Sequence, residues 1–102
     1  MMSVKVERWR RNIMVDFANR AIEHRTRVIH VRLGTLLSWL DTYGEGETFE
    51  EYADITEGLY DVRVTVGRTE EQPAGQVAVF EFPTHLRGAP HLATFHRAGG
   101  RI

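Results

Sequence analysis

Histidine and arginine gather near the end of the chain, in the stretch APHLATFHRAGG at residues 89–100. His91 and His96 flank a short apolar run there, and Arg97 follows at once. Histidine exchanges protons near neutral pH and arginine is permanently charged, so these side chains can supply acid–base chemistry and bind an anion. The same residues also fit the last strand of a small sheet, and both interpretations stay open here.

A metal site is a third interpretation of the histidines. His85 lies six residues before His91, and His96 lies five residues after it. This spacing matches no common ligand motif, and no carboxylate clearly converges on the three rings, so we expect no metal and no cofactor. The chain has no cysteine, which excludes disulfides, thiolate metal sites and cysteine nucleophiles and fits a reducing cytosol.

The length of the chain limits the number of domains. With 102 residues the chain is long enough for one domain and too short for two, so we predict a single domain over residues 1–102. The start, MMSVKVERWRRN, has no apolar run after its charges, unlike a signal peptide. No stretch approaches the ~20 apolar residues of a membrane span, so we expect a cytoplasmic protein with no membrane contact.

Charge is distributed unevenly along the chain, although the net charge is −1. Residues 1–40 carry eight Lys/Arg against three Asp/Glu, a net of +5, whereas residues 41–61 carry eight Asp/Glu and no Lys/Arg, a net of −8. Residues 62–102 carry five Arg against three Glu, a net of +2. The basic parts can contact an anionic partner, and the acidic part can contact a basic partner or cover the basic surface. Alternatively, folding mixes these charges over one solvated surface.

The first quarter of the chain changes its apolar period. Val4 and Val6 alternate with polar residues in SVKVERW, which predicts a short edge strand. From Ile13 onward the apolar residues recur at helical spacing, which predicts a helix over about 13–24.

The following stretch, TRVIHVRLGTLLSWLDTYG, allows two interpretations. Its apolar residues form the stripe of an amphipathic helix, so we favour a helix over about 26–43 that ends before Gly44. Residues 26–33 are also rich in β-branched side chains, which fits a strand. Beyond Gly44 the chain is acidic, and we expect one helical turn around Phe49–Ala53.

Alternating apolar residues predict three strands in the second half of the chain. In LYDVRVTVG the residues Tyr60, Val62, Val64 and Val66 share one face, with Arg63 on the other. After the loop RTEEQPAG, QVAVFEF is the partner strand and HLATFHR the third. The predicted fold is therefore α+β: a short N-terminal strand, two helices, and a three-stranded antiparallel meander packed against the helices.

Three segments of the chain carry a resemblance to a known family. They are LLSWLDTYGE, TEGLYDVRV, and the pair GQVAVFEF with HLATFHR. Their order along the chain and their local sequences resemble the RelE/HigB-type toxins of toxin–antitoxin modules, particularly the phage-derived Gp49-like branch. The resemblance covers about residues 13–98. The resemblance implies a RelE-like fold and mRNA cleavage on the ribosome, which inhibits translation. It also implies a helix-turn-helix antitoxin, the ribosome and mRNA as partners, in a homo- or hetero-oligomer.

The resemblance also implies which residues act. RNA cleavage at a 2′-hydroxyl needs a base, an acid and cations that stabilise the phosphorane. Arg63, His96 and Arg97 occupy the positions of the family's basic residues and are the expected catalytic residues. The expected RNA-binding residues are Arg8, Arg10, Arg11, Arg68, His91 and Arg101. At Ala53, Asp54 and Ala78 the family often carries basic residues, so catalysis can be degenerate here.

Other functions fit parts of the sequence. A non-enzymatic accessory binding protein of a phage or mobile element, or a virion assembly protein, would explain the missing cations and the acidic block. A ribbon-helix-helix DNA-binding protein would need residues 26–33 to be a strand, with Thr26, Val28, His30 and Arg32 facing the groove. Glu50 and Glu51 oppose that hypothesis, because they begin a helix that should approach phosphates.

Overall fold

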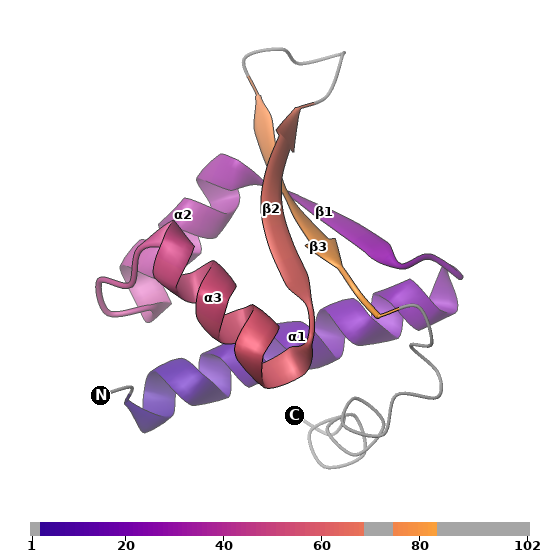
Figure 1. The fold of residues 1–102 in the computed structure, drawn as a ribbon. Helices are drawn as coiled ribbons and strands as arrows, with labels where there is room; N and C mark the ends of the chain where they lie inside the picture. Colours follow the sequence, from indigo (N-terminus) through magenta and orange to yellow (C-terminus); the bar gives the residue numbers. More distant parts are fainter. Residues whose placement is uncertain (1–2, 69–74, 84–102) are drawn as a thin grey trace.

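The computed structural model describes residues 3–68 and 75–83 and shows an α+β arrangement (Figure 1). The elements of this part of the chain, in order, are α1 (Val4–Glu23), β1 (Val28–Arg32), α2 (Leu33–Tyr43), α3 (Phe49–Tyr60), β2 (Arg63–Arg68) and β3 (Gln76–Glu81).

The strands form an antiparallel sheet in which β3 lies between β1 and β2. Phe80 of β3 is opposite Ile29 on one side and Val64 on the other. Two residues further along, Ala78 is opposite Val31 and Val66. Since side chains alternate along a strand, these residues share one face of the sheet, and that face turns toward the helices.

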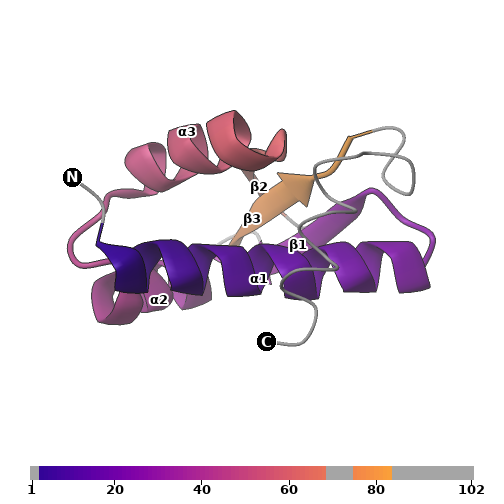
Figure 2. The same ribbon diagram turned by 90° about the horizontal axis from the view of Figure 1, so that it is seen from below.

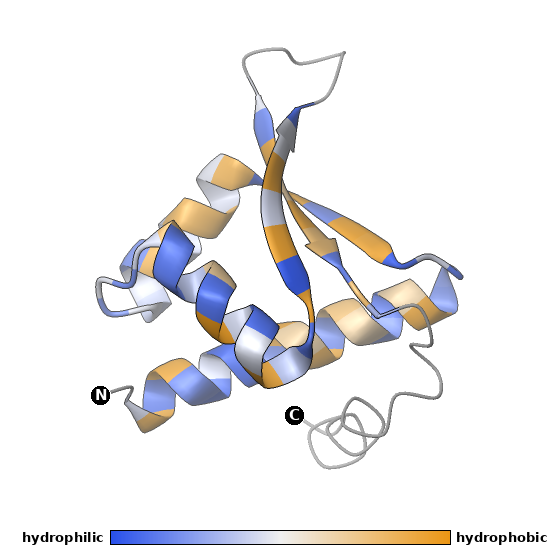
Figure 3. Ribbon diagram, in the orientation of Figure 1, coloured by the Kyte–Doolittle hydropathy of each residue, from blue (hydrophilic) through white to orange (hydrophobic). Residues whose placement is uncertain are grey.

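The helices of the described chain pack on this one face of the sheet (Figures 1 and 2). The core between them is built from aromatic and aliphatic side chains: the ring of Phe17 on α1 meets Phe80 edge-on at 5.0 Å between centroids. Phe80, Ala78 and Tyr52 are fully buried in the same cluster. The opposite face of the sheet is covered by no described helix. Figure 3 shows hydrophobic and hydrophilic residues alternating along β2.

Local hydrogen bonds define where two of the helices begin. The Ser3 hydroxyl accepts a hydrogen bond from the Val6 N–H at 3.1 Å and caps α1. At α3, Thr48 and Glu51 form a capping box in which each side chain accepts from the other residue's backbone N–H. Gly44 ends α2, and a Cβ at this position would lie 2.7 Å from the Leu40 carbonyl oxygen, so only glycine fits.

A buried ion pair joins α1 to the loop between α2 and α3. The guanidinium of Arg10 donates two hydrogen bonds to the Glu47 carboxylate, each 2.9 Å long. The Arg10 side chain is 0% exposed and that of Glu47 is 10% exposed. Arg10 also lies over the ring of Tyr52, 5.4 Å from its centroid. This cluster therefore connects α1, the loop and α3 in the interior.

Several expected elements differ in the structure. The strand predicted around Val4 and Val6 is wrong, because α1 begins at Val4 and extends well beyond the helix expected over 13–24. Val6 faces the core with Arg10 and Met14, at the spacing of a helix. A sequence pattern that counts arginine as a surface residue does not place Arg10 on the buried face. It therefore does not connect Val6 to the helix that continues through Met14.

The helix expected over 26–43 is also wrong at its start, because the stretch divides into β1 and α2. Ile29 and Val31 pack against the core whereas His30 and Arg32 are exposed, which is the alternation of a strand. The strand alternative for this stretch is therefore confirmed. The helical turn expected at Phe49–Ala53 is a full helix, α3, which includes the predicted strand residue Tyr60.

The remaining strands agree in outline with the prediction. β2 begins at Arg63, and its Val62–Val64 side turns inward as expected, whereas Val66 is 41% exposed near the far end of the strand. QVAVFEF forms β3 as predicted. The third strand expected at HLATFHR and most of the RTEEQPAG loop lie outside the described residues.

We predict that the buried ion pair is essential for stability. Glu47→Gln leaves a buried guanidinium without its counter-charge, and this should lower the free energy of unfolding by about 3–5 kcal/mol. Asp16→Asn is the matched control, because Asp16 pairs with Arg20 on the same helix but both side chains are 56% exposed. The control should cost less than about 1 kcal/mol in urea denaturation. Equal losses in the two variants would contradict the prediction.

We also predict a specific loss of stability at alkaline pH. Burial raises the pKa of the Tyr52 phenol well above its ordinary value, and nearby Thr56 and Arg10 offset only part of this rise. The unfolded chain ionises this phenol near pH 10 whereas the folded chain keeps it protonated. The contribution of the protonated Tyr52 phenol to the free energy of unfolding is therefore complete below about pH 10. Above that pH it decreases by up to about 1.4 kcal/mol per pH unit.

Tyr52→Phe tests this pH dependence, because it removes the ionisable group and keeps the ring. Urea denaturation of both proteins between about pH 8 and 11 should show a smaller decrease for the variant. Parallel decreases in the two proteins would mean that Tyr52 does not cause the alkaline loss.

Candidate nucleic-acid interface

The sheet face that turns away from the helices carries the predicted residue Arg63, and we call this face the open face. Its residues follow from the strand register and are Val28, His30 and Arg32 on β1, Arg63 and Thr65 on β2, and Val77, Val79 and Glu81 on β3. His30, Arg32, Arg63 and Thr65 are exposed, and the residues of the central strand are half-buried. A floor of valines between exposed polar and basic side chains suits contact with an extended ligand.

The open face has a net positive charge. Arg32 and Arg63 lie on its two outer strands, and Glu81 is its one carboxylate within the described register. Arg27, which precedes β1, neutralises Glu81 with an Arg27 Nη2–Glu81 Oε2 contact of 3.3 Å. The Nε of Arg27 also donates to the Phe82 carbonyl oxygen at 3.3 Å. Arg32 and Arg63 against Glu81 leave one net positive charge, and the flanking Arg27 and Asp61 offset each other.

Arg63 differs from Arg27 in its contacts. Glu81 is its direct neighbour across the sheet, yet the Glu81 carboxylate is engaged by Arg27. Within residues 3–68 and 75–83, Arg63 makes no ion pair and no side-chain hydrogen bond. Arg63 is therefore exposed and open to a ligand, as its position on the strand predicts.

A hollow of about 270 Å³ lies at the end of the sheet where Arg63 begins β2, and we call it the corner hollow. Its lining residues are Arg27, Asp61, Arg63, Glu81, Phe82 and Pro83. Asp61 is the C-cap of α3 and has a left-handed backbone with φ of 59°. Its backbone N–H donates to the Glu57 carbonyl oxygen at 2.9 Å, which fixes the residue at the rim.

Arg8 and Arg11, two of the expected RNA-binding residues, lie on α1 and line a different hollow. This hollow of about 240 Å³ also includes Val4, Glu7 and Tyr60. Burial raises the pKa of the Tyr60 phenol, and Arg10 and Arg11 oppose this rise. Since α1 packs on the other face of the sheet, these arginines form a second basic surface, separate from the open face.

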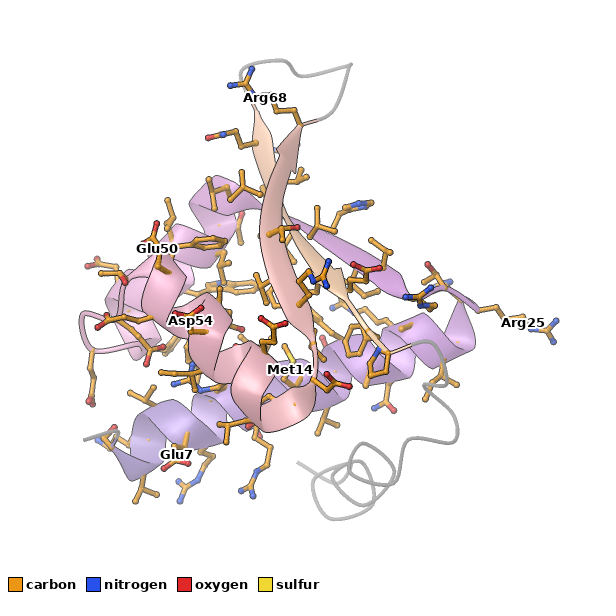
Figure 4. The ribbon with its side chains drawn as sticks, in the orientation of Figure 1. Glu7, Met14, Arg25, Glu50, Asp54 and Arg68 are labelled. Atoms are coloured by element: carbon orange, nitrogen blue, oxygen red, sulfur yellow. The ribbon has the colours of Figure 1, made fainter. Side chains whose placement is uncertain are left out.

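The other expected site residues have different locations. Arg10 is fully buried and bound to Glu47, so its charge is not at the surface. Arg68 ends β2 and lies where the strand projects past the helices (Figure 4). Arg68 is five positions after Arg63 on the same strand, and because side chains alternate, the two lie on opposite sheet faces. His91, His96, Arg97 and Arg101 lie outside the described residues.

Two positions where the resemblance implies basic residues are not on the open face. Ala78 is fully buried on the helix side of β3, where an arginine would not fit without rearrangement. Asp54 is exposed on α3 and belongs to a row of carboxylates at helical spacing: Glu50, Asp54, Glu57 and Asp61. We call this row the acidic stripe, and Figure 4 shows Glu50 and Asp54 projecting from α3.

Some candidate residues were not expected from the sequence in their present role. Arg27 and Glu81 form a cross-sheet pair because β1 lies beside β3, and that strand order has no local sequence signal. His30 and Arg32 were expected at a binding surface only in the ribbon-helix-helix hypothesis. Its strand is present, but β1 pairs with β3 of the same chain.

Comparison with known proteins finds no matching family, no matching curated protein and no matching solved structure. In the described part of the chain, no group of three or more histidine or acidic side chains is arranged to hold a metal ion. None of the helices described here has the length and apolar character needed to cross a membrane.

Proposed function

We propose that this protein binds RNA on the open face and that, like the toxins it resembles, it cleaves mRNA at the ribosome and inhibits translation. The observation that carries the binding proposal is the exposed Arg63 on a positively charged face of the sheet that none of the described helices covers. Arginine binds phosphate through its planar fork of donors, and the backbone charge of RNA dominates the affinity of basic surfaces.

The shape of the open face supports RNA over duplex DNA. The sheet has short strands and presents a shallow floor of valines with a histidine beside it. Exposed sheet faces are used by common RNA-binding modules, where unpaired bases lie on the strands. His30 is the ring on this face that can stack on a base.

Cleavage needs more than binding. Arg63 supplies a cation for the phosphorane, and a carboxylate or a histidine must move the proton of the 2′-hydroxyl. Within the described residues, the carboxylates beside Arg63 in the corner hollow are Asp61, which makes no ion pair there, and Glu81, which Arg27 already binds. His96 and Arg97 are the further candidates that the resemblance implies.

A second candidate function is protein binding without catalysis, as an accessory protein of a phage or mobile element. The acidic stripe favours it, because Glu50, Asp54 and Glu57 make no ion pair with the described residues and repel RNA from this side. A basic protein surface, such as that of a helix-turn-helix antitoxin, complements the stripe. The two functions use different faces and are compatible in one molecule.

We predict that wild-type protein binds single-stranded RNA and that Arg63→Ala weakens this binding about tenfold, equivalent to about 1.4 kcal/mol, the order of one charge-assisted hydrogen bond. The slope of log affinity against log salt should become shallower, because the variant has one positive charge fewer on the RNA-binding face. Fluorescence anisotropy measures both quantities. Arg20→Ala on α1 is the control, and an equal effect of both variants would remove the open face from the proposal.

We further predict that tightly induced expression of the wild type arrests bacterial growth and protein synthesis. Arg63→Ala and the double variant His96→Ala/Arg97→Ala should relieve the arrest while remaining folded by circular dichroism. Normal growth and translation with soluble, folded wild type would contradict cleavage and favour the protein-binding function. The next experiment would then be a pull-down with Glu50→Gln/Asp54→Asn/Glu57→Gln as the control.

A further inference from the structure

Asp61 and Arg63 form an unusual pair in the corner hollow. Both are exposed and flank the buried Val62, so their side chains leave the backbone toward solvent and line the same hollow. Opposite charges this near in sequence often pair, yet neither side chain makes an ion pair or a side-chain hydrogen bond within residues 3–68 and 75–83. The hollow thus presents the Arg63 guanidinium, which can donate hydrogen bonds to a ligand, and the Asp61 carboxylate, which can accept them.

The other charged residues of the hollow are already engaged. Arg27 binds the Glu81 carboxylate and the Phe82 carbonyl oxygen, and its own backbone carbonyl accepts the Phe82 N–H at 2.7 Å. On this side of the hollow, the charged groups of Arg27 and Glu81 are therefore already paired with each other. The complementary ligand has to satisfy Asp61 and Arg63 together.

A simple phosphate fits this hollow poorly. Two arginines and two carboxylates line it, so the lining has no net charge, and Asp61 would repel an anion bound at Arg63. The ligand must therefore offer hydrogen-bond acceptors to the guanidinium and donors to the carboxylate. Its size is also limited, because about 270 Å³ is below the roughly 300–1,000 Å³ of pockets for drug-sized molecules.

We infer that the corner hollow binds a guanine base of single-stranded RNA. Guanine offers two adjacent acceptors, O6 and N7, which match the arginine fork. Next to them, N1–H and the N2 amino group are two adjacent donors, which match the two oxygens of a carboxylate. Adenine, cytosine and uracil each lack at least one of these two pairs. This inference rests on the proposed RNA-binding function, and it assigns Arg63 and Asp61 to base recognition in place of the catalytic roles considered for them above.

The backbone of Asp61 makes the inference testable without unfolding the protein. Its left-handed conformation is strained for most residues, but asparagine adopts it as readily as aspartate does. Asp61→Asn therefore keeps the size and backbone of the residue and replaces one carboxylate oxygen by an amide donor. Asp54→Asn makes the same chemical change on α3, outside the corner hollow, and is the matched control.

The experiment compares two short RNA strands, oligoadenylate and the same strand with one guanosine, by fluorescence anisotropy with the full chain. Wild type and Asp54→Asn should bind the guanosine strand about tenfold more tightly, the order expected for one bidentate base contact. Asp61→Asn should bind both strands with equal affinity, at the level of wild type with oligoadenylate. Arg63→Ala should likewise remove the guanosine preference. Amide NMR spectra should place the guanosine-dependent shifts at Asp61 and Arg63.

Each outcome has a distinct meaning. RNA binding without a guanosine preference, or a preference that Asp61→Asn retains, overturns the guanine inference and leaves the RNA-binding proposal standing. If no RNA binds to the wild type, both proposals are overturned. A preference that both asparagine variants lose would assign the effect to net charge and would also overturn the guanine inference.

Discussion

The fold depends on a charge held where water cannot reach it. Arg10 is fully buried, and a guanidinium in the interior is stable only if a carboxylate meets both arms of its fork. Glu47 does this from the loop between α2 and α3, while Tyr52 of α3 offers its ring. One side chain of α1 thereby fixes the loop and α3 around it. This paired geometry adds a directional constraint to the hydrophobic packing of the helices.

The arrangement of the helices determines where ligands can bind. Because α1, α2 and α3 pack on the same face of the sheet, the apolar partners of Phe80 face inward and the intervening residues face outward. Basic residues of β1 and β2 therefore gather on the open face, and the acidic residues of α3 gather on the acidic stripe. The uneven charge along the chain is partly retained after folding in these two regions, whereas the Arg10–Glu47 pair joins the basic and acidic segments in the interior.

The sequence predicts those parts of the fold whose signal is local. Alternation along VRVTV and QVAVFEF predicts β2 and β3 and places Arg63 outside the core, since a two-residue period depends only on neighbours. The start of α1 could not be predicted, because its buried face includes Arg10, whose burial depends on Glu47 thirty-seven residues later. The boundary between β1 and α2 has no glycine or proline before Leu33, and Ile29 happens to continue the helical stripe. The Arg27–Glu81 pair requires knowledge of the strand order.

Asp61 is placed against the local preferences of the chain, and this supports a role in binding. A left-handed residue at a helix C-terminus is usually glycine, and a negative charge there opposes the helix dipole. Asparagine would adopt the same backbone without a negative charge, and glycine would adopt it without steric cost. Aspartate is nevertheless the residue beside Arg63 at the rim of the corner hollow, without an ion pair within the described residues. Strain and unfavourable charge at one residue are typical of positions where stability is lower in favour of ligand recognition. The Arg10 cluster contributes to this site indirectly. It holds α3 in place, and α3 in turn holds Asp61 at the edge of the open face.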